Sequence, residues 1–595
     1  MKKLNKQILI GILTSVLALS PLAGCKGSPA ASSTAPASQA ASGETSGTAS
    51  GASKYKDAIQ VDVFDSQANY QGVQSGWFAK VVKDKFNMTL NLIAPNVAGG
   101  GDNLFNTRSA AGNLGDIVMI GSENGRLQNT AKAGLLLDLT DKIQNYKNLA
   151  SYTKALDMVK GLVSDGKIYA MPSQVSNSPA TTPSEGYDLT YGPYIRWDYY
   201  TAIGSPEINN MDDMLNVLKT MQQKFPKSDS GKKTYGFSLF KDWDGNMMCT
   251  AKNMLACIYG YDEQGFQFLS ADGHTAQSII DDSSYYVKAL QYLYKANQMG
   301  LVDPDSTTQN YDTMYAKYQD GQILYSMWPW LGQAAYNTVD HKNAGKGFMI
   351  APVKDVKIFS YGCSPAGNKY VIGVGSKAKD PDRMLDFIDW LYSPEGVEMS
   401  CSQTTGSCGP EGLTWELKDG KPVLTDFGKQ AFSGATVNVP AEWGTGTWKD
   451  GISQLNYQAV QAVDTDPNTK AAYNYTLWDS YLADNKTALD TSWQTKMSAK
   501  TTLDYLKQHD MYVVSPGNAY VPAAAGTEVD TMRNQCKAII IQNSWKMVFA
   551  KNETEFNSLL KQMQTTVKGL GYDKVLAFDQ SISDKYKEAR DAALK

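Results

Sequence analysis

The sequence has few of the residues that metal and redox chemistry require. Among 595 residues there are three histidines, and His274, His341 and His509 lie far apart along the chain. The seven cysteines form neither a CxxC pair nor a Cys/His spacing typical of zinc. A GxSxG motif and a phosphate-binding loop ending in Lys-Ser/Thr are also missing. We therefore predict no metal site and no cofactor.

One acidic stretch begins like a calcium-binding loop, with Asp464, Asp466 and Asn468 at alternate positions. Such a loop requires Gly at its sixth position and Glu at its twelfth, whereas this chain has Thr469 and Tyr475 there. The stretch is therefore not identified as a calcium site.

The chain also lacks an excess of positive charge. It has 56 Lys plus Arg against 60 Asp plus Glu, a net charge of −4. This leaves no overall basic surplus for gripping a phosphate backbone, so we predict no nucleic-acid partner. Tyrosine and tryptophan are abundant instead, with 34 Tyr and 12 Trp beside 17 Phe. Because these rings combine an apolar face with a polar tip, some of them could face a ligand as well as fill a core.

The N-terminus reads as a secretory signal. Lys2, Lys3 and Lys6 precede an apolar run over residues 8–22. As a helix this run would rise only about 22 Å, which is short of a bilayer core of about 30 Å. It ends in Leu22-Ala23-Gly24-Cys25, which resembles the lipobox of bacterial lipoproteins. That resemblance implies that residues 1–24 are removed and that Cys25 becomes the lipidated first residue.

Residues 25–54 are predicted to form a disordered tether. All but four of the 29 residues from Lys26 to Lys54 are Ser, Ala, Gly, Thr or Pro, which cannot nucleate a core. The rest of the chain has no apolar run of about 20 residues, so we expect membrane attachment through the N-terminal lipid only.

The body opens with alternating strand and helix patterns. Ile59, Val61 and Val63 have strand spacing, and residues 73–86, 88–93, 102–111 and 116–120 then read as helix, strand, helix and strand. This alternation predicts a parallel sheet covered by helices. Ligands bind beyond the carboxyl ends of such strands, so the loops at 65–70 and 121–126 are of interest. Later helices are predicted at 211–225, after Asp380, after Ser393 and at 556–570.

Several segments occur in the order found in one protein family. They are Gly115-Asp116-Ile117-Val118, Gly134 to Thr140, Asp165 to Pro172, Tyr194 to Asp198, Gly321 to Trp330, Val371 to Val374 and Tyr392 to Gly396. Together they resemble extracellular solute-binding proteins of bacterial ABC importers, in the branch related to maltose-binding protein. The C-terminal part, with Ser544-Trp545-Lys546 and 556–573, resembles a large lipoprotein subgroup found mainly in Gram-positive bacteria.

This resemblance implies an α/β periplasmic-binding-protein type II fold, with two α/β lobes, a hinge and an interlobe ligand cleft. Lobe 1 would comprise 55–172 and about 354–430, and lobe 2 about 173–353 and 431–595. The chain would cross between lobes at 168–173 and return near 351–359. The implied protein is a monomer on the extracellular face of the cell membrane that hands its ligand to the transmembrane subunits of an ABC permease. Closure around a ligand that contacts both lobes is a population shift.

The same resemblance suggests ligand residues. Glu123 and Asn124 lie where maltose-binding proteins place an acid and a polar partner for sugar hydroxyls, and Asp65 and Gln67 occupy the analogous loop after the first strand. Trp328 stands in a segment whose tryptophan stacks on a sugar ring in this family. Weaker candidates are Trp243, Trp443, Trp448 and Tyr70, and core packing is the alternative for each ring.

Two other functions stay open at this point. A peptide-binding receptor would fit the large size, and a secreted glycoside hydrolase would need two carboxylates about 5 to 10 Å apart, for which Glu411 and Glu442 could serve. The lipobox, the tether and the importer-like segments favour an oligosaccharide-binding protein that is not an enzyme.

Overall fold

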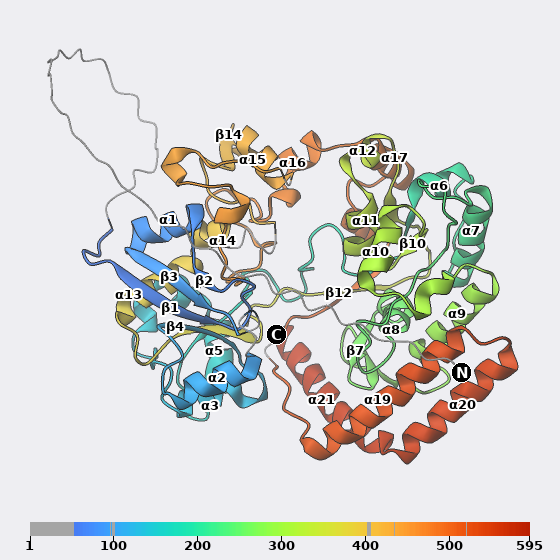
Figure 1. Cartoon of the computed structure of the whole chain (residues 1–595), viewed down its shortest axis with the longest axis horizontal. Helices are drawn as coiled ribbons and strands as arrows, with labels where there is room; N and C mark the ends of the chain where they lie inside the picture. The colour runs from blue at the N-terminus through green and yellow to red at the C-terminus, as the bar shows by residue number, and fades with distance from the viewer. Residues whose placement is uncertain (1–52, 96, 98–100, 401–405, 434, 519) are drawn as a thin grey trace, which may run out of the picture. The chain divides into compact units, whose positions relative to one another are not determined.

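The computed structural model describes residues 53–595 except 96, 98–100, 401–405, 434 and 519 (Figure 1). The predicted signal peptide, Cys25 and nearly all of the tether lie outside the described residues, and so does Cys401. Residues 51–595 form one compact unit, which contains two large hydrophobic cores. We call the parts built around these cores the first and second lobes.

The first lobe is built on a mixed sheet with a parallel centre, in which antiparallel pairings outnumber parallel ones. The order of its strands is β2 (Gly72–Val73), β3 (Met88–Ile93), β1 (Ile59–Asp65), β4 (Ile117–Gly121), β13 (Tyr370–Val374) and β5 (Met171–Pro172). β1 pairs in parallel with β3 and β4, whereas β13 runs antiparallel to β4 and β5. The predicted parallel βαβαβ opening is confirmed by the parallel register of β1 with β3 and with β4.

Helices cover this sheet and extend the lobe. They are α1 (Gly76–Phe86), α2 (Gly101–Ala110), α3 (Arg126–Lys132), α4 (Lys147–Ser151), α5 (Thr153–Gly161), α13 (Pro381–Leu391), α14 (Pro394–Ser400) and α15 (Asp426–Phe432), with the hairpin β14 (Trp415–Lys418) and β15 (Lys421–Leu424). α13 begins where the sequence predicts, since Asp380 accepts a hydrogen bond from the Arg383 backbone and Pro381 needs no donor at the first helical position.

The second lobe contains two small antiparallel sheets and most of the helices. The strand orders are β10 (Tyr325–Ser326), β6 (Tyr194–Arg196), β11 (Phe348–Ile350) and β7 (Tyr261–Gln264), β8 (Gln267–Ser270), β9 (Ala276–Ser278). The helices are α6 (Trp197–Ala202), α7 (Met211–Lys224), α8 (Cys249–Leu255), α9 (Tyr285–Gln298), α10 (Tyr311–Gln319), α11 (Pro329–Tyr336), α12 (Val339–Asn343), α17 (Ala488–Met497), α18 (Thr502–Gln508), α19 (Thr527–Val548), α20 (Glu553–Gly569) and α21 (Tyr572–Ala593).

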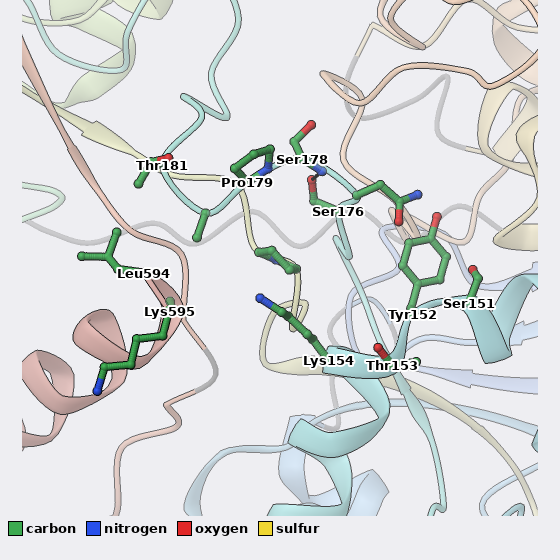
Figure 2. A pocket seen from close by; sticks show the side chains of 14 residues that line it. Ser151, Tyr152, Thr153, Lys154, Ser176, Ser178, Pro179, Thr181, Leu594 and Lys595 are labelled. Carbon is green, nitrogen blue, oxygen red and sulfur yellow. Dashed lines mark hydrogen bonds between the residues drawn. The ribbon is translucent and has the colours of Figure 1, made fainter.

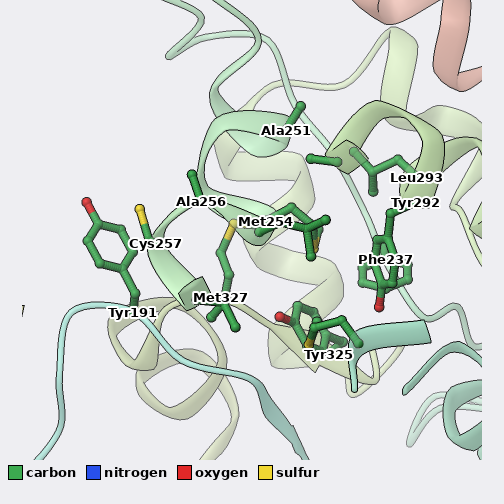
Figure 3. Close-up of a cluster of buried hydrophobic side chains, with 14 of the residues drawn as sticks. Tyr191, Phe237, Ala251, Met254, Ala256, Cys257, Tyr292, Leu293, Tyr325 and Met327 are labelled. Carbon is green, nitrogen blue, oxygen red and sulfur yellow. The ribbon is translucent and has the colours of Figure 1, made fainter. Parts of the chain in front are cut away.

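The core of this lobe is rich in methionine and aromatic rings. Figure 3 shows part of it, where Met254 of α8 and Tyr292 of α9 lie among the side chains packed near Phe237 and Tyr325. The Phe237 ring lies 5.9 Å from that of Tyr292 and 5.1 Å from that of Tyr325. The five described cysteines are buried free thiols.

The expected lobe boundaries differ from the observed packing. The core of the first lobe continues through Leu455, Tyr457 and Tyr473, which the sequence analysis assigned to the second lobe. Ile358 and Phe359, assigned to the first lobe, lie in the core of the second. Apolar runs of this kind fit either core, so their assignment depends on tertiary contacts.

The crossing points also differ from those expected. Met171 and Pro172 form β5 of the first sheet, so the chain leaves this lobe only after Val175, whose backbone N–H donates to Ala459. The return follows β12 (Ile358–Tyr361), which pairs in parallel with β16 (Tyr512–Ser515). The chain passes between the lobes once more after Tyr473, which lies in the core of the first lobe, and before Leu489, which lies in the core of the second. This connection contains α16 (Asp479–Asp484).

Two long helices near the C-terminus were not anticipated. Residues 556–570 form most of α20, as predicted, but α20 is not the last helix, because α21 follows it and α19 precedes it. The buried side of α21 includes Asp579, Ser583 and Arg590, and polar residues at buried positions remove the apolar periodicity on which helix prediction depends.

Candidate functional site

The carboxyl edge of the first sheet gathers four loops. β1 ends at Asp65 and β4 at Gly121, and the parallel pairing of these strands puts both ends at one edge. β13 runs the other way and pairs Tyr370 with Gly121, so Asn368 and Lys369 enter at the same edge. β5 adds Gln174 there, because Pro172 pairs with Val371. The predicted residues after β1 and β4 are thus brought together with polar residues that the sequence did not single out.

Asp65 is completely buried and shapes its loop. One carboxylate oxygen accepts hydrogen bonds from the backbone N–H groups of Gln67 and Ala68, at 2.8 and 3.1 Å. The other, Oδ2, is buried with no partner among the described residues. Burial raises the pKa of Asp65 to about 7, against the lowering effect of these hydrogen bonds. Asp65 therefore positions the partly exposed Gln67, and its own side chain is covered.

Glu123 lies at the edge itself, in a short 3-10 turn after β4. Its Oε1 lies 3.3 Å from the Lys369 ammonium, and its Oε2 is buried without a hydrogen-bond partner among the described residues. The carboxylate folds back over Gly121, where a Cβ atom would lie 2.2 Å from Oε2. Glycine at the end of β4 thus makes room for this carboxylate. Asn124 follows in a left-handed conformation with φ of 56°, and it is exposed.

A row of side-chain amides continues the edge toward the hinge. The Asn368 amide donates to the Gln174 side chain at 3.0 Å, and the Gln174 amide donates to the Gln458 side chain at 3.3 Å. The Asn456 amide donates to the Gln67 backbone at 2.8 Å. Amides supply both donors and acceptors, so this row suits a ligand with many hydroxyl groups. Its side-chain amides come from three distant segments, and no local pattern marks them in the sequence.

Aromatic rings form a cluster in the second lobe. The Trp243 ring stacks on Tyr311 at 4.7 Å, and the Trp330 ring stacks on Trp328 at 4.7 Å. Trp243 and Trp330 lie 5.5 Å apart and are 45% and 38% exposed, whereas Trp328 is 4% exposed. We call Trp243, Tyr311, Trp328 and Trp330 the aromatic cluster. Trp330 and Tyr311 are at least partly exposed here, although neither was among the predicted ligand residues. Trp328 is buried beneath Trp330 and stacks on it.

Two acidic residues hold the Trp243 loop. Asp242 accepts a hydrogen bond from the Tyr311 backbone at 2.8 Å. Asp244 accepts from the indole of Trp545 at 2.7 Å and from the Cys249 backbone at 2.8 Å. These bonds fix the loop against α10 and α8, so the exposed indole is placed by rigid elements.

The remaining predicted rings lie in the first lobe. Trp448 is buried, its ring stacks nearly parallel on Trp77 at 4.7 Å, and its carbonyl accepts from the Trp77 indole. Trp443 is partly buried against the same core, and the Tyr70 hydroxyl donates to the Val73 carbonyl. The structure thus places Trp448 in the core and leaves Tyr70 and Trp443 partly exposed. Glu411 and Glu442, the pair considered for hydrolysis, are both exposed.

A cavity of about 450 Å³ lies at the hinge and contains none of the predicted ligand residues. Figure 2 shows Tyr152 and Lys154 of the first lobe on one side, Ser176 to Thr181 of the crossing segment above, and Leu594 and Lys595 on the other side. Beside it, Asp464 accepts hydrogen bonds from Ser176 and Ser178, at 2.6 and 2.8 Å. The acidic stretch that resembles a calcium loop therefore anchors the crossing segment.

The fold has relatives of known structure. Three cover 89% of this chain and 99% of their own: the alginate-binding protein AlgQ2 without calcium ion (15% identity, TM-score 0.54), the S. pneumoniae ABC-transporter substrate binding protein FusA in complex with kestose (16%, 0.54), and an HMO-binding ABC-transporter associated solute-binding protein from Bifidobacterium longum infantis (14%, 0.57). At these identities the likeness shows the fold, which confirms the expected two-lobed type II binding-protein architecture.

Sequence comparison identifies the family. The bacterial extracellular solute-binding protein family matches residues 83–410, which is more than half of the chain. No protein of curated function matches. In the part of the chain that the structure describes, no helix is both long and apolar enough to cross a bilayer. The expected family is confirmed: this chain belongs to the bacterial extracellular solute-binding proteins.

Proposed function

We propose that this protein is the lipid-anchored receptor of an ABC importer, and that it captures an oligosaccharide between its lobes and delivers it to the permease. The observation that carries the proposal is the aromatic cluster. Trp243 and Trp330 expose large ring faces from rigid supports, and such faces cover the C–H side of a pyranose or furanose ring. Capture and delivery of a ligand need no catalysis, and we assign no catalytic residue.

The polar edge of the first lobe supports the same ligand class. Glu123 and the amide row offer several acceptors and donors within one edge, as a sugar with many hydroxyls needs. The charge of Glu123 is balanced by Lys369, which favours a ligand without net charge. Gln67 and Asn124 are partly or fully exposed beside them and complete the proposed contacts.

The cargo of the structural relatives supports a carbohydrate as well. FusA was solved with kestose, and the Bifidobacterium protein is described as HMO-binding.

The N-terminus would attach the protein to the membrane. Cleavage after residue 24 and lipidation of Cys25 would hold it at the outer face. Cleavage also removes three lysines, which would change the net charge from −4 to −7. A monomer that contacts the permease through both lobes in the closed state is the simplest assembly.

Binding and turnover measurements on the soluble protein from residue 26 test the proposal. A panel of neutral oligosaccharides, acidic oligosaccharides and peptides is screened by thermal shift, and hits are titrated by calorimetry. We expect a saturable rise in melting temperature with at least one oligosaccharide and no released reducing sugar. A best hit among the peptides would overturn the carbohydrate class, and turnover of a bound glycan would overturn the assignment as a receptor.

A further inference from the structure

A small cavity beside the hinge lies apart from the residues discussed so far. Its volume is about 210 Å³, which is below the roughly 300–1,000 Å³ of pockets for drug-sized ligands. Its walls come from β7, β12 and the last turns of α21, and they include Asp262, Tyr361, Tyr586 and Arg590. The volume suits one small group rather than an extended chain.

Arg590 lacks the partner that a buried guanidinium normally has. The residue is 8% exposed, and its Nη1 donates to the Ser270 carbonyl at 2.8 Å. Its Nε is buried and has no hydrogen-bond partner among the described residues. Burial lowers the pKa of Arg590. A buried donor without a partner is costly, so the hydrogen-bonding capacity of this guanidinium, which lines the cavity, is incompletely used within the described residues.

A partly buried arginine of the same helical region, Arg533, has a carboxylate partner. Arg533 donates to both carboxylate oxygens of Asp579, at 3.0 and 2.6 Å. Asp579 is buried, and its carboxylate also accepts a hydrogen bond from the Phe266 backbone N–H. Arg590, which is more deeply buried than Arg533, has no such carboxylate pair among the described residues.

Asp262 supplies an acceptor on another wall of the cavity. Its Oδ2 accepts from the Tyr361 hydroxyl at 2.7 Å and its Oδ1 from the Glu263 backbone at 2.7 Å. Each oxygen keeps a second lone pair for a further donor. Burial raises the pKa of Asp262, although these hydrogen bonds oppose the rise. A ligand hydroxyl would therefore be a favourable additional donor.

The other walls decide between a charged and a neutral occupant. Glu263 is already paired with Lys252 at 2.8 Å, so Arg590 and Asp262 are the remaining charges and they balance. The cavity also has rings on two sides, since the Arg590 guanidinium lies over Tyr586 at 5.6 Å and Tyr361 is 37% exposed. An anion would gain from Arg590 but would meet Asp262. A ring with hydroxyl groups can accept from one and donate to the other.

We infer that this cavity is a second carbohydrate site, which holds a single neutral sugar residue between Arg590 and Asp262. A ring hydroxyl accepts from the Arg590 guanidinium, a neighbouring hydroxyl donates to Asp262, and the ring lies against Tyr361. The inference rests on the proposed carbohydrate ligand class, but it concerns a site separate from the aromatic cluster. Because β12 and the residues after β16 form one wall, an occupant would contact the hinge directly.

Monosaccharide binding by the chain from residue 26 tests the inference. Glucose, galactose, mannose, fructose and N-acetylglucosamine are titrated against the wild type and three variants. We expect one of these sugars to bind, with affinity at least ten-fold weaker in Arg590→Gln and in Gln264→Trp, whose larger side chain would fill the cavity. Trp330→Ala should leave this affinity within two-fold. Lys585→Gln, on the exposed side of α21, is the matched charge control.

Each other outcome overturns the second site. Equal affinity in Arg590→Gln and Gln264→Trp would place the sugar elsewhere, and loss in Trp330→Ala would place it at the aromatic cluster. Stabilisation by acetate or phosphate that depends on Arg590, without any sugar binding, would make this an anion site. If Arg590→Gln does not fold, Gln264→Trp decides alone, because it retains the arginine. Failure of every oligosaccharide to bind would instead overturn the proposed function, whatever the monosaccharide result.

Discussion

The Asp464 carboxylate lies 2.6 Å from the Ser176 hydroxyl, although 288 positions separate the two residues in the chain. Asp464 is buried at the edge of the first lobe, and Ser176 begins the segment that crosses to the second. The same carboxylate accepts from the Asn177 backbone at 2.6 Å. A single buried acid thus fixes where the crossing segment leaves the first lobe.

We expect Asp464→Asn to destabilise the protein by roughly 1–3 kcal/mol, because the amide would turn a donor toward the Asn177 N–H and leave buried groups unpaired. The free energy of unfolding from urea titration measures this loss. Asp157→Asn, at an exposed residue of α5 that pairs with Lys160, should change it by less than about 0.5 kcal/mol. An Asp464→Asn variant as stable as the wild type would contradict the anchoring role.

In the aromatic cluster, we expect the exposed rings to determine ligand affinity and the buried ring to determine stability. Trp243→Ala and Trp330→Ala should each weaken oligosaccharide binding by roughly 1–3 kcal/mol in calorimetry, because each removes an exposed ring face. Trp328→Ala should instead lower the free energy of unfolding by roughly 3–5 kcal/mol, since it leaves a cavity in the core. Tyr294→Ala, at a partly buried ring on α9, controls for loss of an aromatic side chain elsewhere. Unchanged affinity in both exposed-ring variants would remove the cluster from the site.

Glu123 and Gly121 act together at the end of β4. Glu123→Gln should weaken binding by about 1.5–3 kcal/mol, because it removes a charge that accepts hydrogen bonds from hydroxyls. Gly121→Ala should weaken binding as well, since its methyl group would displace the Glu123 carboxylate. Both effects are read as dissociation constants, beside Glu416→Gln on the exposed hairpin. If Gly121→Ala binds normally while Glu123→Gln does not, the observed placement of the carboxylate is irrelevant to binding.

Asp65 should make stability fall as pH rises from about 4 to 7. Burial raises its pKa to about 7, so the folded state binds a proton more tightly than the unfolded chain. The stability that protonation contributes is present at low pH and is lost as pH rises from about 4 to 7, by about 1.4 kcal/mol per unit at most. The difference in unfolding free energy between wild type and Asp65→Asn should follow this slope and level off above pH 8.

Asp138 provides a comparison of opposite sign. Burial acts to raise its pKa, but hydrogen bonds from Lys167 and Thr140 hold it below the usual value. Its contribution is therefore present at neutral pH and is lost as pH falls into the acid range. The wild-type minus Asp138→Asn difference should decline toward low pH. For Asp65, a wild-type minus Asp65→Asn difference that does not change with pH would contradict the raised pKa.

Local patterns predicted the opening of the first lobe well. The strand at Ile59–Asp65 was identifiable by its alternating apolar residues, and the strand at Ile117–Gly121 by its continuous apolar run. α13 was identifiable because Asp380 and Pro381 mark a helix start. The place of Glu123 beyond β4 follows from the same strand order. α21 was missed, since Asp579 and Arg590 occupy positions on its buried side.

The sequence alone determined the family, the parallel sheet and the loops at its carboxyl edge, because these depend on residue order and on periodicity within a few turns. Tertiary structure decided which rings are exposed. Trp328, Trp330 and Trp448 are chemically equal in the sequence, and only packing against distant segments buries Trp328 and Trp448 and leaves Trp330 at the surface. It also decided the lobe boundaries, the amide row and the burial of Arg590, because burial and hydrogen bonding between remote residues are properties of the folded chain.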